Sequence, residues 1–441
     1  MKWSKLLDKK INVRYFLLLM ICFVGLSVLL LGALRHQYLG GKKMGKWGYY
    51  LKNIAEYPAL VYHSLNLILG YDLPLINKKY VPNGFTYFYK QFTDTGFILE
   101  SVYDKNIQQY IIKLIAVENG QTIYTWTPLL ATLHLSKKSQ VVHPHLSKDG
   151  TVVFSTGWDG GETFEYIVKI DSLSKLVWSK RILPHHSIET DAEGNIWVPT
   201  VIKEQNIVYT QLPIGKNIQN EAITQISIDG KILFQKSVLQ ILLENGYSAL
   251  LLGIGIVDED LAHLNEVRPA LYSSPYWQKG DLLISLRHKS TVFLYRPSTN
   301  KITWLQTGPW MNQHCPDFLD SNKISVFGND IIRGEGGDYL LHGSNDIYIH
   351  DFATHTTITP YSNMMRELGV RTPTQGRLKI FPNGDVFIDE SDSGRTIRAN
   401  KNGPIWIFEN RYDKNHIALT IWNRYLVKNG DCKFCLTENL K

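Results

Sequence analysis

The chain is poor in cysteine, with four residues in 441, which is too few for a disulfide scaffold. It also lacks a basic run interleaved with aromatic residues, so its net charge of +7 does not indicate nucleic-acid binding. No phosphate-binding P-loop pattern and no HExxH zinc motif occur. Hydrophobic residues make up 44% and charged residues 20%, which is typical of a globular protein with a substantial core.

The four cysteines are scattered and do not define a site. Cys22 lies in an apolar N-terminal segment and Cys315 follows His314. Cys432 and Cys435 form a CKFC motif with no following histidine, which argues against haem attachment. Two cysteines alone do not complete a zinc site, but in an oxidising compartment they could pair as a local loop. A redox role for this pair and docking of the tail elsewhere remain open alternatives.

An apolar segment near the N-terminus predicts a membrane anchor. Residues 15–34 are twenty residues without charge, enough to cross about 30 Å of hydrocarbon. The preceding residues are basic, so we expect the N-terminus in the cytoplasm and the rest of the chain across the membrane. No small-x-small cleavage site follows Leu34, which favours an uncleaved anchor over a signal peptide. The predicted order is a basic stub at 1–14, a transmembrane anchor at 15–34 and a juxtamembrane connection at 35–84.

From about residue 85 the sequence indicates an all-β domain, because short apolar runs alternate with turns and no long amphipathic helix is evident. Two kinds of turn recur. Polar turns that lead into alternating strands occur at 147–154, 191–198, 278–286, 320–327 and 382–388. Turns that lead into strands ending in an aromatic residue occur at 118–126, 171–178, 229–234, 298–304 and 401–408.

The spacing of these turns predicts a six-bladed β-propeller at 85–415. The first kind recurs after 44 residues from Gly150 to Gly194, and after about twice that to Gly280. Several short strands in a repeat of this length are typical of a propeller blade. The count of six includes one weak blade near 351–360. A sandwich or barrel is the structural alternative, and 416–441 is assigned to a C-terminal tail that carries the CxxC motif.

Candidate catalytic residues fall at comparable points of successive repeats. They are His185, His186, His263, Asn265, Arg287 and His314. Asn265 follows His263 by two, so on an extended strand both side chains would face the same side. A single histidine or arginine at such a position is more often structural than catalytic, and Asn265 could be a plain turn-former, but closure of a ring would gather these residues around one axial site. Metal binding by the histidines is a competing use, although their spacing is not that of a common zinc motif.

The ordered motifs resemble a known family. The segments HHSIETDAEGNIWV, DLAHLNEV, LLISLRHKSTVFLY, NQHCPDFLD and TQGRLKIFPNGDVFI are similar to those of bacterial arylsulfotransferases that do not use the nucleotide donor PAPS. The resemblance covers roughly 140–410. It implies a six-bladed propeller in the periplasm, here attached to the bacterial inner membrane as a single-pass protein.

The resemblance also implies roles for the candidate residues. His314 would be the nucleophile that forms a sulfohistidine, while His263, Asn265 and Arg287 would hold the sulfuryl oxygens. A histidine of the His185–His186 pair, with His186 preferred, would assist proton transfer. An aryl sulfate donor and a phenolic or other hydroxyl acceptor would be the substrates, and the expected mechanism requires no cofactor and no metal.

Two other functions stay open at this stage. A non-catalytic propeller that serves a membrane-associated assembly, or that forms a homo-oligomer, would use the same anchor. A metal-dependent propeller hydrolase would use the same histidines. The sequence identifies neither the donor nor the acceptor.

Overall fold

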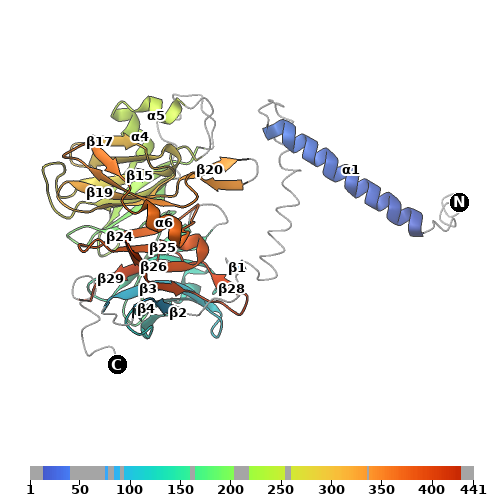
Figure 1. The fold of residues 1–441 in the computed structure, drawn as a ribbon, viewed down its shortest axis with the longest axis horizontal. Coiled ribbons are helices and arrows are strands. Elements are labelled where there is room, and N and C mark those ends of the chain that lie inside the picture. The colour runs from blue at the N-terminus through green and yellow to red at the C-terminus, as the bar shows by residue number, and fades with distance from the viewer. Residues whose placement is uncertain are drawn as a thin grey trace. The chain divides into compact units, whose positions relative to one another are not determined.

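The computed structural model describes residues 13–39, 75–77, 84–89, 94–158, 164–202, 218–253, 260–334 and 337–428. The chain divides into two units, Met1–Pro74 and Leu75–Lys441. The described part of the first unit is helix α1, Val13–Leu39, which contains the predicted anchor at 15–34 (Figure 1). Apolar side chains such as Phe16 and Phe23 are exposed on it. Within the described ranges, no helix combines the length and apolarity needed to cross a membrane.

The second unit is a six-bladed β-propeller, as the sequence repeat predicts. In the described residues, five four-stranded sheets and one five-stranded sheet follow one another along the chain. The first blade consists of β29 (Arg424–Leu426), β3 (Phe97–Asp104), β4 (Gln109–Ala116) and β5 (Thr122–Trp126). The second consists of β6 (Val141–Leu146), β7 (Val152–Trp158), β8 (Phe164–Ile170) and β9 (Leu176–Arg181). The third consists of β10 (Glu189–Thr190), β11 (Ile196–Val201), β12 (Glu221–Ile226) and β13 (Ile232–Ser237).

The remaining three blades repeat this order. The fourth consists of β14 (Leu264–Pro269), β15 (Leu282–Leu286), β16 (Thr291–Arg296) and β17 (Lys301–Thr307). The fifth consists of β18 (His314–Phe318), β19 (Lys323–Gly328), β22 (Asp346–Asp351) and β23 (Thr356–Ile358). The sixth consists of β24 (Arg377–Ile380), β25 (Val386–Glu390), β26 (Arg395–Asn400) and β27 (Gly403–Glu409), with β2 (Gly84–Tyr87) added at its outer edge.

The ring closes through the C-terminal strand β29. It pairs antiparallel with β3, with Arg424 opposite Leu99 and Leu426 opposite Phe97 (Figure 1). The structure therefore corrects the predicted tail at 416–441, because its first half completes the first blade. A further pair of short strands, β1 (Leu75–Asn77) and β28 (His416–Ala418), lies outside the blades. The CKFC motif lies outside the described residues.

The two recurring kinds of turn have fixed places in the blades. The first kind joins the first and second strands of five blades, and the second kind joins the third and fourth strands of five blades. In the first kind, Gly150 and Gly194 have φ of 82° and 84°, a conformation that other residues rarely adopt. The weak repeat predicted near 351–360 corresponds to the two outer strands of the fifth blade.

Short insertions connect some of the blades and strands. Helices α4 (Val238–Glu244) and α5 (Ser248–Leu252) follow the third blade, and α6 (Ser362–Leu368) follows the fifth. A hairpin of β20 (Ile331–Gly334) and β21 (Gly337–Leu340) projects between β19 and β22 (Figure 1). The described residues also include the short 3-10 helices η1 (Leu130–Leu133), η2 (Arg287–Lys289) and η3 (Ser391–Ser393).

The hydrophobic core lies between adjacent blades. Val153 of the second blade packs in one buried cluster with Ile196 and Ile226 of the third. Phe387 of the sixth blade shares another cluster with Ile98 of the first. Each sheet thus buries both faces, which explains why second strands such as β11 and β15 are largely apolar rather than alternating. The packing makes each blade dependent on its two neighbours.

The innermost strands carry an unusual backbone feature that positions the site. Each contains, or closely follows, one residue with positive φ: Trp422, His143, His186, His263, Cys315 and Gly376. Non-glycine residues rarely adopt this conformation, and functional sites often hold such residues. His263, with φ of 54°, is therefore not extended, and a bulge follows between Leu264 and Glu266. The expectation that His263 and Asn265 share one side of an extended strand is wrong for this reason.

We expect the closing strand to be essential for stability. A chain ending at residue 415 loses β29 and the partner of β3, whereas a chain ending at residue 428 retains both. The shorter chain should melt at least about 10 °C below the full chain, since a loss of several kcal/mol shifts the melting temperature by that order. The chain that ends at residue 428 should have the same melting temperature as the full chain. Equal melting temperatures for both truncations, measured by circular dichroism, would contradict closure through β29.

Candidate active site

The structure brings the four predicted histidines together at the beginnings of three inner strands. The rings of His185 and His186 are 3.9 Å apart between centroids. His186 lies 5.1 Å from His263 and 5.5 Å from His314 by the same measure. These residues come from the third, fourth and fifth blades, so only closure of the ring can gather them. The convergence that the sequence predicts is present, and the individual roles remain predictions.

His314, the first residue of β18, is fully buried and held in one orientation by Asn329. Its Nδ1 lies 2.7 Å from Asn329 Oδ1. The Asn329 amide nitrogen donates to the carbonyls of Thr372 and Gln375, both at 2.6 Å, so its oxygen must face the imidazole. His314 Nδ1 therefore carries the proton and donates it to that oxygen. The lone pair is left on Nε2, which has no hydrogen-bond partner among the described residues.

The surroundings of His314 keep it uncharged. Burial is the larger cause and the positive charge of Arg287 the next, and together they lower the pKa of His314 to about 3. The imidazole is accordingly neutral at pH 7, the state in which Nε2 can attack an electrophile. Orientation and protonation state thus agree on a nucleophile whose reactive atom is Nε2.

A chain of contacts runs from Asp260 through His263 to His186. The Asp260 carboxylate accepts hydrogen bonds from the backbone N–H and from Nδ1 of His263. His263 Nε2 lies 3.0 Å from His186 Nε2. Because Nδ1 of His263 donates to a carboxylate, its Nε2 accepts from His186 when both rings are neutral. Burial and then the neighbouring imidazoles hold the pKa of His186 well below its usual range.

His185 is buried and packs against the ring of His186. Its Nδ1 lies 3.7 Å from Glu221 Oε1, which also accepts the backbone N–H of Leu264 at 2.6 Å. Burial is the largest cause that raises the pKa of Glu221. His185 therefore supports the third blade against the fourth and makes its closest ring contact with His186.

Asn265 and Arg287 occupy different positions relative to the nucleophile. The amide nitrogen of Asn265 donates to the carbonyl of Gln313 at 2.7 Å, directly before His314. Asn265 thus holds the backbone that carries the nucleophile. Arg287 directly follows β15, is buried, and donates from Nη2 to the carbonyl of Pro373 at 3.4 Å. Its charge acts on His314, as the lowered pKa of that residue shows.

Three residues of the cluster are not predicted from the sequence: Asp260, Asn329 and Trp422. Asn329 directly follows β19, the second strand of its blade, just as Arg287 directly follows β15. An alignment of repeats would therefore have found it. The Trp422 ring lies 6.2 Å from that of His186 and 6.5 Å from that of His314, but it belongs to the segment assigned to a tail.

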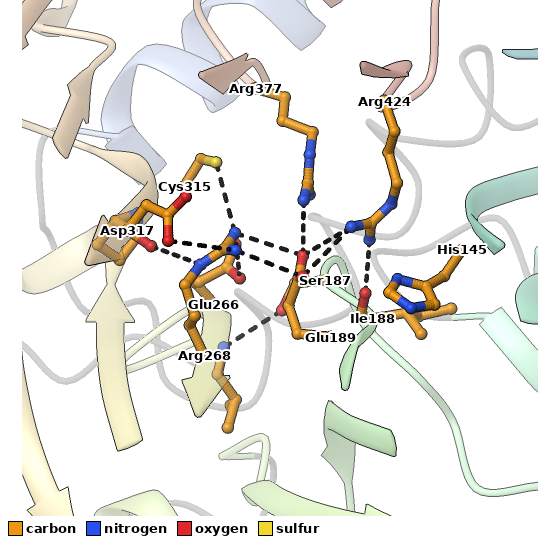
Figure 2. Close-up of polar contacts among 12 residues, drawn as sticks. His145, Ser187, Ile188, Glu189, Glu266, Arg268, Cys315, Asp317, Arg377 and Arg424 are labelled. Atoms are coloured by element: carbon orange, nitrogen blue, oxygen red, sulfur yellow. Dashed lines mark hydrogen bonds and ion pairs between the residues drawn. The ribbon is translucent and has the colours of Figure 1, made fainter. Parts of the chain in front are cut away.

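Directly beside the histidines, a buried ion network joins the inner strands (Figure 2). Glu189 is its centre and accepts from Arg377 at 2.8 Å, from Arg424 at 3.1 Å and from Arg268 at 3.4 Å. Burial alone would raise the pKa of Glu189, but the three guanidinium groups together hold it well below its usual range. Because Glu189 and the arginines come from four blades, the network fixes these inner strands to one another.

A cavity of about 560 Å³ lies next to this network, at the opposite ends of the inner strands from the histidines. Its lining includes Arg268, Arg377 and Arg424, together with the turns at 147–149 and 191–194. None of the four clustered histidines lines it. The Glu189 network therefore separates this cavity from the candidate active site.

Removing the charge of Glu189 should strongly destabilise the propeller. E189Q leaves three buried guanidinium groups without their shared carboxylate, and breaking a buried ion pair typically costs about 3–5 kcal/mol. E193Q is the matched control, because Glu193 forms an exposed ion pair with Lys279 that is worth at most about 1 kcal/mol. Denaturant unfolding measures both. Equal stabilities of the two variants would show that the network is not structural.

Buried neutral histidines should also make the fold sensitive to acid. Burial lowers the pKa of His145 to about 3, and His314 behaves alike. Both pKa values lie below the value of about 6.5 that a histidine has in the unfolded chain. Between about pH 6.5 and pH 3 the unfolded state therefore binds more protons than the folded state. The free energy of unfolding consequently falls as the pH is lowered through this window. Glu266, whose pKa burial raises to about 7, opposes this trend between about 4.5 and 7.

We expect H145Q to flatten this dependence. Removing one such histidine lowers the slope of the unfolding free energy by up to about 1.4 kcal/mol per pH unit below pH 6. H416Q is the control, because His416 is partly exposed and pairs with Asp413 at the surface. Parallel stability–pH curves for the wild type and H145Q would contradict the assignment.

Comparison with solved structures finds only remote similarities. A protein of unknown function from Bacteroides caccae is 13% identical, with a TM-score of 0.47 over 76% of this chain and 99% of that chain. TolB from Acinetobacter baumannii is 11% identical, with a TM-score of 0.42 over 76% and 67%. Virginiamycin B lyase from Staphylococcus aureus is 12% identical, with a TM-score of 0.36 over 74% and 86%. Similarities this remote carry no functional argument.

Sequence comparison is more specific. No curated protein matches the chain. The family model described as Arylsulfotransferase (ASST) matches residues 143–411, which is more than half of the 441 residues. That span includes His186, His263, Arg287 and His314. The chain therefore belongs to the arylsulfotransferase (ASST) family.

Proposed function

We propose that the protein transfers a sulfuryl group from an aryl sulfate ester to a phenolic or other hydroxyl acceptor, through a sulfohistidine at His314. The observation that carries this proposal is the Nε2 atom of His314. It is unprotonated, has no hydrogen-bond partner among the described residues, and belongs to an imidazole that burial keeps neutral. Membership of the arylsulfotransferase family supports the reaction class.

In the first half-reaction, the Nε2 lone pair attacks sulfur in line with the aryl oxygen. An N–S bond forms, the S–O bond to the aryl group breaks, and the phenolate leaves with the bonding electrons. Sulfuryl transfer resembles phosphoryl transfer, in which a loose transition state spreads charge over the peripheral oxygens. Catalysis then depends mainly on positioning and on fixed positive charge. A hydroxyl acceptor attacks the same sulfur in the second half-reaction and regenerates His314.

In this scheme His186 and His263 donate a proton to the leaving group and accept one from the acceptor. A phenolate, whose conjugate acid has a pKa near 10, needs a proton when it leaves, and the acceptor must lose one. The Asp260 carboxylate at Nδ1 stabilises a second proton on His263, and the 3.0 Å contact connects this ring to His186. The pair can therefore give a proton in one half-reaction and take one in the other.

We assign the stabilisation of the negative charge on the sulfuryl oxygens to Arg287 rather than to Asn265. Arg287 presents a planar set of donors, and its charge reaches His314. Asn265 is engaged with the carbonyl of Gln313, so we assign it the positioning of the nucleophile. This differs from the role that the family resemblance implies for Asn265.

We also propose that α1 anchors the protein in a membrane, with the propeller on the side opposite the N-terminus. The uncharged run at 15–34 and the exposed apolar side chains of α1 support this. The full chain should remain in the membrane pellet after alkaline carbonate extraction, whereas a chain lacking residues 1–39 should be released. Release of both would contradict the proposed anchor.

Loss of the His314 imidazole should abolish transfer. We expect H314A to reduce the transfer of sulfate from an aryl sulfate to a phenol by at least about 10³-fold, as for other covalent nucleophiles. H342A is the matched control, since His342 is an exposed histidine outside the cluster. Full transfer by H314A, measured as released phenol, would overturn the nucleophile assignment.

Asn329 should act through the tautomer of His314. N329A frees Nδ1 from its acceptor, and we expect kcat to fall by about 10²- to 10⁴-fold, as when the orienting partner of a catalytic histidine is lost. N345A is the matched control: Asn345 also donates to the carbonyl of Thr372, and the contacts of its amide are with the backbone of Asn329 and Thr372 rather than with His314.

Two readouts separate positioning from stability. Both asparagine variants should lose similar stability, but only N329A should change the nitrogen-15 imidazole signals that report the Nδ1–H tautomer. An unchanged kcat in N329A, or an equal loss in N345A, would argue against tautomer control.

A further inference from the structure

Three imidazoles of the cluster converge on one point. His185, His186 and His263 each offer one ring nitrogen, and these three atoms lie within 4.8 Å of one another. The Nε2 atoms of His186 and His263 face each other at 3.0 Å. Two nitrogens bound to a tetrahedral ion at about 2.05 Å would be about 3.3 Å apart. Two of the three positions are thus already close to ligand spacing, and His185 must turn towards them.

The surroundings of these rings are those of metal ligands. A metal-bound histidine usually directs its second nitrogen to a carboxylate or a carbonyl, which orients the ring and raises its basicity. Asp260 occupies this place at Nδ1 of His263, and Glu221 lies 3.7 Å from Nδ1 of His185. Both carboxylates would also offset the charge of a cation. His186 is partly exposed, which offers an ion a route to the cluster.

We infer that His185, His186 and His263 form a binding site for one divalent transition-metal ion of the Zn²⁺ type. Imidazole ligands suit zinc, copper and nickel, and three of them leave a fourth position of a tetrahedral ion open. If the proposed function holds, a bound ion occupies the two imidazoles that transfer protons. The metal is then an inhibitor of sulfuryl transfer, and this consequence alone rests on the proposed function.

A second group, Asp260, His263 and His288, could also hold an ion. Its nitrogens are already engaged, because Nδ1 of His263 donates to the Asp260 carboxylate and Nδ1 of His288 donates to the Asp260 carbonyl at 2.8 Å. Binding there would break both contacts. In the first group an ion would replace the hydrogen bond between His186 and His263 and would require His185 to turn, but it would leave both contacts of Asp260 intact, so we assign the site to this group.

The test is metal binding by the purified full-length protein after treatment with EDTA. Titration with zinc chloride, followed by calorimetry and elemental analysis, should show one equivalent. H185Q should weaken binding by at least about 100-fold and D260N by about 10- to 100-fold, the range for second-shell residues. H288Q is the matched control and should bind as the wild type. The wild type should also bind Co²⁺ and show the visible absorption of a tetrahedral site, a readout that needs no variant.

The outcomes are separable from those of the proposed function. No zinc binding, or undiminished binding by folded H185Q, would overturn the metal site whatever the activity. Loss of binding in H288Q but not in H185Q would place the ion in the second group and also contradict the assignment. Transfer in EDTA without metal tests the proposed function alone. If both hold, zinc should inhibit the wild type at concentrations at least tenfold below those that inhibit H185Q.

Discussion

A single buried carboxylate, Glu189, is the constraint on which the propeller's centre depends. Three arginines from three other blades converge on it and share its carboxylate. A buried charge is costly unless it is paired with good geometry. The network therefore selects one relative placement of the inner strands. Two of these strands, β10 and β14, begin shortly after His186 and His263, so the network also helps to fix the active-site geometry.

The chemistry follows from this burial. Burial lowers the pKa values of His143 and His186 well below the usual range and that of His314 to about 3, with neighbouring positive charges adding to the effect. Neutral imidazoles serve as nucleophiles and proton acceptors, and they are also metal ligands. Asn329 then distinguishes His314 from the others, because it directs the proton to Nδ1 and leaves Nε2 reactive. His263 differs because its Nδ1 donates to the Asp260 carboxylate.

The left-handed residues of the inner strands explain how side chains reach the centre. In a regular strand, successive side chains alternate between the two faces of a blade. In each blade one residue with positive φ, in or just before the innermost strand, breaks this alternation. In four blades it is His143, His186, His263 or Trp422, whose rings contact one another in sequence. Gly376 fills the position in the sixth blade, where an added Cβ would lie 2.5 Å from Phe327.

The repeat of turn residues was sufficient to predict six blades, because each turn needs glycine or a polar residue at a fixed place. The convergence of His186, His263 and His314 followed from the ring. The closing strand was missed, since the three residues of β29 carry too little periodic pattern to be recognised. Asp260 was missed because its role depends on a contact across a loop rather than on spacing along a strand. Asn329 was missed although it occupies the same place after the second strand of its blade as Arg287. The face of Asn265 was misjudged because the backbone at His263 is left-handed.

The most direct test of the account is to supply an aryl sulfate donor without an acceptor and to map the modified peptide. We predict a stoichiometric sulfuryl group on the peptide that contains His314, bonded to Nε2, and lost when a phenol is added. Turnover without a modified His314 peptide, or a sulfuryl group on another histidine of the cluster, would contradict the central claim.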